Sequence, residues 1–348
     1  MSDPGRGFVN EVKDAVTGRA ALLVIGVLLL QLGFITSYIG ALHQPEPHRL
    51  SIGVVAPTAA AQQQAIGALD QVPNEAVHAT PVSDQQSAVH QIKDQQLYAA
   101  LLVNPDGTQD TLLIASARGK SAATAAQSIV TAVEQHQGRT VQVQDVAPLA
   151  GGDANGLSSF YLVVGWCVGG YLVASILGIS AGARPANHAR ALIRIAVLAL
   201  YSIVAGLGGV LIAGPILNAL PGSILGLWGV GTLVVFSVGT FTMALECLFD
   251  VVGIGVAVLI FVVLGNPSAG GVFPPPLLPP FWRAIGPWLP NGAGTSATRS
   301  IAYLGGTRLT MPLLVLVAWA VVGVAVSLLA VHSRSRGGRM TVAPPERD

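Results

Sequence analysis

Charged residues are scarce in this sequence. Of its 348 residues, 10% are charged and 52% are hydrophobic, whereas a soluble domain carries roughly 25% charged residues. The deficit is local, because residues 43–156 contain ten acidic and five basic residues while the later apolar segments contain almost none. The composition therefore predicts a helical membrane protein with one soluble domain. A net charge of +1 excludes a globally basic nucleic-acid-binding protein.

Cysteines and catalytic motifs are also scarce. The two cysteines, Cys167 and Cys247, lie in apolar segments, so residues 43–156 have no disulfide framework. The histidines lack metal-ligand spacing, and no metal site is predicted. Gly119-Lys120-Ser121 matches the end of a P-loop, but Ile114 stands where the motif requires glycine. Neither H-E-x-x-H nor G-x-S-x-G occurs, so we expect no enzymatic activity and no cofactor bound by this chain.

Six apolar segments are long enough, or nearly so, to cross a bilayer, which takes about 20 residues. They are Ala20–Leu42, Phe160–Ser180, Ile195–Ala213, Ile224–Leu245, Val251–Leu264 and Pro312–Val331. The fifth is short, but Ser223–Gly265 as one helix would reach roughly 64 Å, about twice the hydrocarbon core. We therefore predict six transmembrane helices, with residues 20–42 as an uncleaved first span and residues 157–332 as a five-helix domain.

Basic residues near the span ends predict the orientation, because Lys and Arg concentrate on the cytosolic side. Arg6, Lys13 and Arg19 precede the first span, Arg184, Arg190 and Arg194 separate the second from the third, and Arg334, Arg336, Arg339 and Arg347 follow the sixth. These groups share one side of a six-span protein. Residues 1–19 and 333–348 are then cytosolic and residues 43–156 extracytoplasmic. The lack of glycosylation sequons and outer cysteines fits a bacterial plasma-membrane protein.

Strand and helix patterns alternate through residues 43–156. Strands are predicted at Ser51–Val55, Val77–Val82, Tyr98–Val103, Thr111–Ala115 and Thr140–Val146, and helices at Ala59–Leu69, Gln86–Gln96 and Ala122–His136. Asn104-Pro105-Asp106-Gly107 is a strong turn signal. This alternation is typical of a small α/β domain, so the fold class is a polytopic α-helical membrane protein with an extracytoplasmic α/β domain between helices one and two.

The connection Ala181–Arg194 is the first candidate site. Pro185 favours a helix start, and Arg184, His188, Arg190 and Arg194 supply charge. One interpretation is a short basic helix at the membrane surface that docks a cytosolic partner. The other is that its charge only orients the protein.

The loop Asn266–Thr310 is the second candidate site. Its prolines interrupt regular helix, and its aromatic residues favour a membrane interface. We predict a re-entrant segment followed by a short helix at Thr295–Tyr303, acting as a cap or an outer gate. The candidate gate residues are Phe281, Trp282, Arg283, Trp288, Pro290 and Arg299.

Two further features leave alternatives open. Glu246 and Asp250 form an acidic pair at the predicted cytosolic turn; acids inside a membrane are functional candidates, but ordinary solvation also explains them. Gly165 and Gly169, like Gly178 and Gly182, form GxxxG pairs. Such pairs serve either packing within the chain or a homodimer face.

The loop motif and the order of spans together resemble the permease subunits of type-2 ABC exporters, particularly the phage-infection-protein branch. The matching residues are Ser268-Ala269-Gly270-Gly271 with Pro274, Leu278-Pro279-Pro280-Phe281-Trp282, Ile285, Pro287-Trp288-Leu289-Pro290 and Arg299, together with Asp84–Val103 in the α/β domain. The resemblance implies a transport pathway between two permease copies. It also implies a separate ATPase subunit that binds ATP and docks on Ala181–Arg194.

The resulting hypothesis is a permease that exports a hydrophobic or amphipathic substrate. The alternative is a non-transporting envelope receptor, scaffold or assembly protein that acts through its outer domain. A proton-driven exporter is disfavoured, because the spans carry almost no ionisable residues near their middles.

Overall fold

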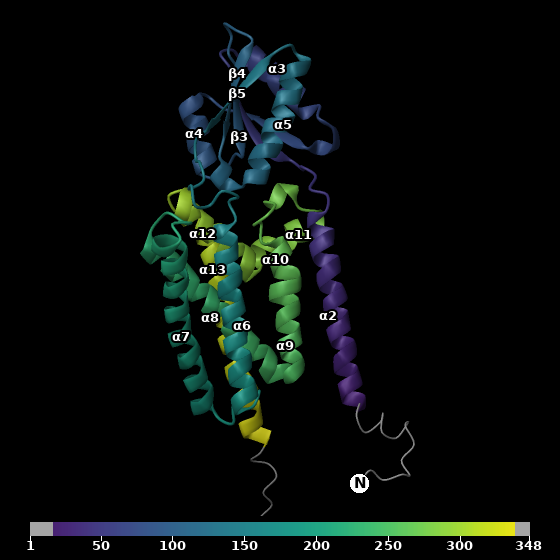
Figure 1. Ribbon diagram of the computed structural model, residues 1–348, viewed down its shortest axis with the longest axis vertical. Helices are drawn as coiled ribbons and strands as arrows, with labels where there is room; N and C mark the ends of the chain where they lie inside the picture. The colour runs from purple at the N-terminus through teal and green to yellow at the C-terminus, as the bar shows by residue number, and fades with distance from the viewer. Residues whose placement is uncertain (1–16, 338–348) are drawn as a thin grey trace, which may run out of the picture.

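The computed structural model describes residues 17–337 and has two parts, a sheet domain and a bundle of long helices (Figure 1). Six helices are long and apolar enough to cross a membrane. Their bounds are Ala20–Leu42, Ser158–Ala181, His188–Ile216, Ile224–Phe249, Val251–Ser268 and Thr310–His332. The predicted number of long apolar helices is thus confirmed. We call the end of the bundle that carries the sheet domain the domain end, and the opposite end the far end.

Three boundaries of the predicted spans are wrong by four residues or more. The fourth helix ends at Phe249 rather than Leu245. The other two differences have a local cause. The third span begins at His188 rather than Ile195, because Asn187 caps the helix by accepting a hydrogen bond from Arg190 N at 2.9 Å. The fifth extends to Ser268 rather than Leu264, because α9 (Val251–Val258) continues through a π-helical stretch, Leu259–Leu264, into α10 (Gly265–Ser268). Both errors arise because polar residues stay helical when a cap or a neighbour satisfies them.

The sheet domain contains five strands in the order β2-β1-β3-β4-β5. The strands are β1 (Leu50–Val55), β2 (Val77–Pro81), β3 (Ala99–Leu102), β4 (Gln109–Ile114) and β5 (Thr140–Asp145). The pairs β1–β2, β1–β3 and β4–β5 are parallel, and β3–β4 is antiparallel. The predicted α/β alternation is confirmed, and the antiparallel pair follows from the short turn after Asn104.

Helices cover both faces of this sheet. They are α3 (Ala59–Asp70), α4 (Gln85–Lys93) and α5 (Lys120–His136). Alternate residues of β1, Leu50, Ile52 and Val54, join the core formed with α3 and α5. The opposite face packs against α4 through a second core that includes Ala88 and Ile92. This arrangement follows from the alternation of side chains along a strand.

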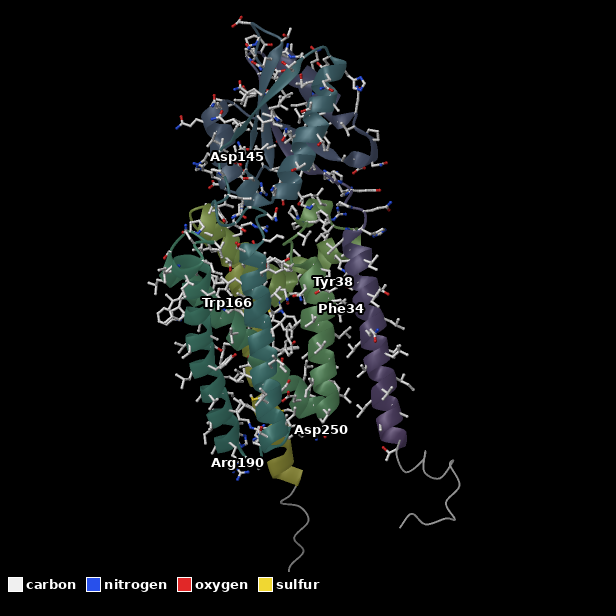
Figure 2. All side chains as sticks on the ribbon, viewed as in Figure 1. Phe34, Tyr38, Asp145, Trp166, Arg190 and Asp250 are labelled. Carbon is white, nitrogen blue, oxygen red and sulfur yellow. The ribbon has the colours of Figure 1, made fainter. Side chains whose placement is uncertain are left out.

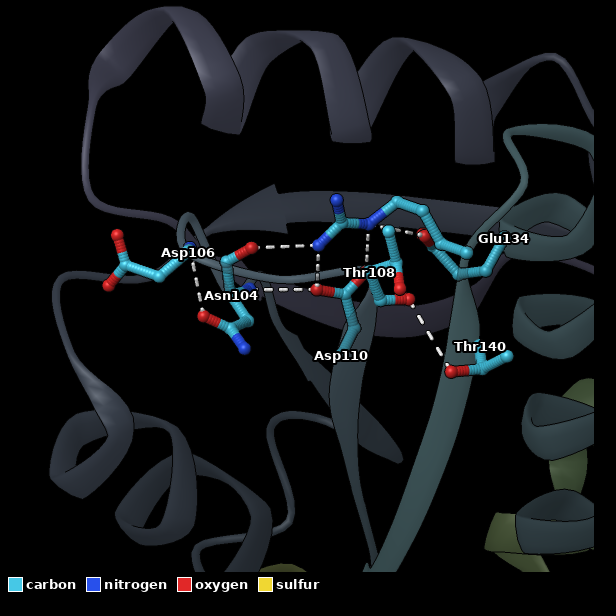
Figure 3. A network of polar contacts seen from close by, with 7 residues as sticks. Asn104, Asp106, Thr108, Asp110, Glu134 and Thr140 are labelled. Carbon is cyan, nitrogen blue, oxygen red and sulfur yellow. Dashed lines mark hydrogen bonds and ion pairs between the residues drawn. The ribbon is translucent and has the colours of Figure 1, made fainter.

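A network of charged side chains lies at the β3–β4 turn of the sheet domain (Figure 3). Arg139 donates two hydrogen bonds of 2.6 Å to the fully buried Asp110 carboxylate and lies 3.5 Å from Glu134. Asp110 also accepts a hydrogen bond from Asn104 N at 2.7 Å. This pairing holds the pKa of Asp110 below its usual value despite its burial. For Glu134, burial and the adjacent Asp110 carboxylate raise the pKa to about 7.

Helix α8 (Ile224–Phe249) is the centre of the bundle, and three helices approach its backbone through glycine. A Cβ at Gly170 of α6 (Ser158–Ala181) would lie 2.8 Å from Val235 O. At Gly206 of α7 (His188–Leu211) it would lie 2.7 Å from Thr232 N. At Gly323 of α13 (Thr310–Gly337) it would lie 2.5 Å from Phe241 N. Small residues therefore set the packing distances around α8.

The predicted GxxxG pairs contribute unequally to this packing. A Cβ at Gly169 would touch the Tyr201 hydroxyl at 3.0 Å, and one at Gly178 would meet the Glu246 carboxylate. A Cβ at Gly165 or Gly182 would meet open space. Packing within the chain thus accounts for one glycine of each pair.

Helix α2 (Gly18–Leu42) stands beside the bundle rather than within it (Figure 1). Most of its apolar side chains are exposed. It contacts the α9–α10 span, where Tyr38 donates a long 3.5 Å hydrogen bond to Val262 O. An exposed apolar helix of this length is suited to lipid contact.

Candidate functional site

Residues 265–309 form an irregular segment between the bundle and the sheet domain. After α10 it contains a short turn of helix, Pro275–Leu277, then α11 (Pro280–Ile285), a second turn at Gly286–Trp288, and α12 (Pro290–Tyr303). The predicted helix at 295–303 starts earlier, because Pro290 occupies the first helical turn, where proline is well tolerated.

Helix α12 is inserted into the domain end of the bundle. Eleven of its fourteen residues are buried, and it packs against α6, α8 and α13. A Cβ at Gly294 would lie 2.9 Å from both Val163 and Val234, so this glycine permits the close approach. The segment therefore packs into the domain end of the bundle. Its re-entry into a membrane stays a prediction.

The aromatic residues of this segment take different positions. Trp282 packs over Gly40 of α2 and donates a 3.1 Å hydrogen bond to Ser37. Phe281 and Trp288 are exposed, although the Trp288 carbonyl accepts a hydrogen bond from Trp319 at 2.8 Å. Arg283 is partly buried. Trp282 thus holds α2 to the segment, while Phe281 and Trp288 face outward.

Arg299 joins the segment to the sheet domain. Its side chain is 9% exposed and donates to Gly270 O at 3.1 Å, to Gly271 O at 3.3 Å and to Arg118 O at 3.4 Å. One turn further along α12, the Tyr303 hydroxyl donates to Asp153 at 2.8 Å. Arg299 therefore fixes the loop before α11 to the base of the sheet domain.

Apolar contacts reinforce this junction. Leu277 of the segment belongs to the core of the sheet domain formed with α3 and α5, and Leu304 belongs to the core on the α4 face. His48 N also donates to Pro276 O at 2.9 Å. The segment and the sheet domain are therefore one packed unit.

Several polar atoms of α12 are buried without a partner. Asn291 Oδ1, Thr295 Oγ1 and Thr298 Oγ1 have no hydrogen-bond partner within residues 17–337, although the Asn291 amide donates to Phe261 O at 2.9 Å. Unpaired buried oxygens are costly in an apolar surrounding. They are unusual in a bundle of otherwise apolar helices, and they mark α12 as a functional candidate.

The connection between α6 and α7 lies at the far end, where Figure 2 shows Arg190 and Asp250. Arg184 donates to Leu248 O at 2.9 Å, and Arg194 to Ala181 O at 2.7 Å. Both contacts tie the connection to neighbouring helix ends. His188 and Arg190 are exposed and available to a partner.

The expected separate basic helix at residues 181–194 is wrong. His188, Arg190 and Arg194 lie on the first turns of α7 itself, because Asn187 caps that helix and Pro185 precedes it. Arg194 is also not exposed, as a docking residue would be. It is only 7% exposed, since α7 turns it inward toward the end of α6.

The burial of Glu246 contradicts the interpretation that Glu246 and Asp250 form an ordinarily solvated acidic pair. It is 1% exposed in α8, and neither carboxylate oxygen has a hydrogen-bond partner among the described residues. Arg194 is the cation in electrostatic reach of it. Asp250 is exposed and forms the turn to α9, with φ of 58°. The two acids diverge because the helix ends between them.

Sequence reasoning missed three residues of the junction, Arg118, Asp153 and Arg308. Arg118 stacks over Tyr98 with its Cζ 3.7 Å from the ring centre. The incomplete P-loop match adjoins it and serves the same junction, since Lys120 donates to Ala154 O at 2.8 Å and Ser121 to Val272 O at 2.9 Å. No local motif identifies these residues, because their neighbours come from distant segments.

Comparison with protein-family models, with curated proteins and with solved structures finds no match to this chain. Among residues 17–337, no three His, Cys, Asp or Glu side chains lie close enough together to hold a metal ion.

Proposed function

We propose that this chain is the membrane-spanning permease subunit of an ABC-type exporter. It would move a hydrophobic or amphipathic substrate out of a bacterial cell together with a separate ATPase subunit. The observation that carries the proposal is the re-entrant helix α12, whose unpartnered polar atoms lie inside a bundle of otherwise apolar helices. Non-spanning helix at membrane depth is tolerated where it lines protein or a water-filled route.

In this proposal the far end is cytosolic and the sheet domain is extracytoplasmic. The basic residues of the α6–α7 connection and of residues 334–347 support this orientation. The ATPase subunit would bind the exposed His188 and Arg190. Its movements would reach the spans through Arg184 and Arg194, whose side chains bond to carbonyls at neighbouring helix ends.

The orientation is tested by thiol labelling in intact cells. Both native cysteines are buried, and Asp106 and Arg190 are exposed at opposite ends of the protein. We expect Asp106→Cys to react with a membrane-impermeant maleimide in intact cells and Arg190→Cys only after lysis. The reverse pattern would overturn the orientation.

The transport proposal is tested by purifying the tagged chain in mild detergent and by measuring flux in inverted vesicles. We expect an ATPase subunit to copurify and ATP to drive uptake of an amphipathic dye. Arg190→Glu should weaken both, since it reverses the charge of the docking surface, whereas Arg283→Glu at the domain end should leave copurification unchanged. Absence of both ATPase and ATP-dependent flux would sink the proposal.

A non-transporting receptor or scaffold is the alternative from the sequence. The shared cores of the sheet domain and the re-entrant segment favour the permease, because an independent receptor domain needs no such insertion. Partner binding through the sheet domain, with no ATP-dependent flux, would favour the alternative.

A further inference from the structure

A cavity of about 620 Å³ lies at the junction between the sheet domain and the domain end of the bundle. The sheet domain contributes Tyr98 and Arg118 to its wall. The re-entrant segment contributes Trp288 and Arg299, and the start of α13 contributes Met311. Three parts of the chain that are far apart in sequence thus meet around one space.

Three arginines line this cavity, and no acidic residue does. They are Arg118, Arg299 and Arg308. None of them lies within 4.0 Å of a carboxylate in the part of the chain that the structure describes. Arginine stays protonated at neutral pH, so the cavity carries concentrated positive charge.

Two of these guanidinium groups, those of Arg118 and Arg299, are held in place by neutral partners. Arg118 donates to Leu97 O and to Gln95 O, the latter at 2.7 Å, and stacks on Tyr98. Arg299 donates to the carbonyls of Gly270 and Gly271. Carbonyl dipoles only partly offset the loss of water around a buried cation. An anion in the cavity would balance the remaining charge.

The nearest acid does not fill this role. Asp153 is in electrostatic reach of Arg299, but its oxygens accept hydrogen bonds from Ser158 N at 2.9 Å, Ser158 Oγ at 2.7 Å and the Tyr303 hydroxyl at 2.8 Å. It is therefore engaged elsewhere and does not line the cavity.

Most of the remaining wall is apolar, although Gln95, Ser296 and Thr310 also line it, and it extends to the first turn of α13. Met311 lies in the first turn of the span Thr310–His332. Trp288 and Met311 are 60% and 56% exposed, and Pro287, Pro312 and Val315 lie beside them. Tryptophan at the end of a span is typical of the membrane interface. An alkyl chain of a ligand could extend along these side chains into lipid.

We propose that this cavity binds an anionic amphiphile, with its phosphate or carboxylate headgroup held by Arg118, Arg299 and Arg308 and its alkyl chain against Trp288 and Met311. Guanidinium groups match both headgroups because they donate paired, charge-assisted hydrogen bonds. The proposal does not rest on transport by the chain. The site would serve equally as a cargo site or as a site for a regulatory lipid.

The test measures binding to the purified full-length chain in a non-ionic detergent, without an ATPase, so that its failure is distinct from failure of the transport proposal. The probes are dodecyl phosphate, its zwitterionic counterpart dodecylphosphocholine, and inorganic phosphate. We expect dodecyl phosphate to bind at least tenfold more tightly than either of the others.

Two variants and a matched control locate the site. Arg308 is exposed and its side chain makes no hydrogen bond or ion pair with the residues described, so Arg308→Ala leaves the fold intact. It should weaken dodecyl phosphate binding about tenfold, the usual effect of losing one charge-assisted contact. Trp288→Ala should weaken dodecyl phosphate but not inorganic phosphate. Arg283→Ala, in the same segment but outside the cavity, should change neither.

Equal binding of dodecyl phosphate and dodecylphosphocholine would overturn the proposal, as would equal effects of Arg308→Ala and Arg283→Ala. If inorganic phosphate binds as tightly as dodecyl phosphate, the arginines bind a free anion and the alkyl chain contributes nothing. That result would also overturn the proposal of an amphiphile site.

Discussion

The buried acidic side chains of this protein differ in the partners that compensate their charge. Asp110 has a bidentate arginine partner and a backbone donor, so its burial is compensated. Glu246 has neither; Ser175 and Arg194 are the groups in reach of its carboxylate, and Nη1 of Arg194 is also unpartnered among residues 17–337. A half-satisfied buried pair stabilises little as a whole but is costly to break.

We therefore predict opposite effects of single and double substitution at this pair. Arg194→Met should lower the free energy of unfolding by about 3 kcal/mol, because it leaves the buried Glu246 without its cation. Adding Glu246→Leu should recover at least half of the loss. The free energy of unfolding is measured by detergent titration for both variants and for Glu246→Leu alone, which together form a double-mutant cycle. Additive losses would show that the two residues do not interact.

The raised pKa of Glu134 predicts that the stability of the sheet domain depends on pH. Its pKa is raised from 4.5 to about 7 in the folded protein, so folding retains a proton that the unfolded chain has already lost. The stabilisation is complete below pH about 4.5 and is lost as the pH rises through about 7. We expect stability to fall by about 2–3 kcal/mol across this window.

Urea unfolding of the full-length protein, read by a brief pulse of protease after equilibration, measures this dependence. Glu134→Gln keeps the shape of the side chain and removes its titration, so the slope between pH 5 and 7.5 should disappear. If the variant keeps the wild-type slope, another group is responsible.

At the scale of elements, helix and strand positions were predictable because local periodicity dictates them. The strands of the sheet domain differ from their predicted bounds by only one or two residues. The larger errors are in the helices. Helix α8 continues four residues past Leu245. At Asn187 and Leu264, a cap and a π-helical continuation depend on neighbours along and across the helix. Glycine contacts were not predictable, since Gly165 and Gly170 look alike in sequence.

These two glycines of α6 make a matched pair of substitutions. Gly170→Ala should destabilise the bundle by about 2 kcal/mol or more, because a rigid backbone atom of α8 lies 2.8 Å from the new Cβ. Gly165→Ala should be neutral or slightly stabilising, since its Cβ meets open space. Thermal unfolding in lipid nanodiscs compares them. Equal losses of stability in the two variants would contradict the prediction that close packing at Gly170 determines the effect.

At the scale of the whole molecule, the sheet domain and the bundle share hydrophobic cores. Leu277, in the segment of residues 265–309, belongs to the core of the sheet domain and is 3% exposed. Because it belongs to both parts, we expect movement of residues 265–309 and opening of the sheet domain to be coupled.

Leu277→Ala should therefore cost about 2–4 kcal/mol and speed hydrogen exchange in β1, β3 and α5 as well as in α12. Leu314→Ala is the control, since Leu314 is 56% exposed on α13 and should alter neither region. Faster exchange confined to residues 265–309 would show that the sheet domain is independent.

The sequence alone determined the number of apolar helices and the α/β alternation, because span length and side-chain periodicity are local properties. It also indicated a re-entrant segment, since prolines prevent a regular span there. Only the tertiary structure decided that α12 is buried, that Glu246 and Arg194 face inward, and that Arg118, Arg299 and Arg308 surround one cavity. These features depend on which faces of distant segments meet, and the apolar residues that drive such packing are interchangeable in sequence.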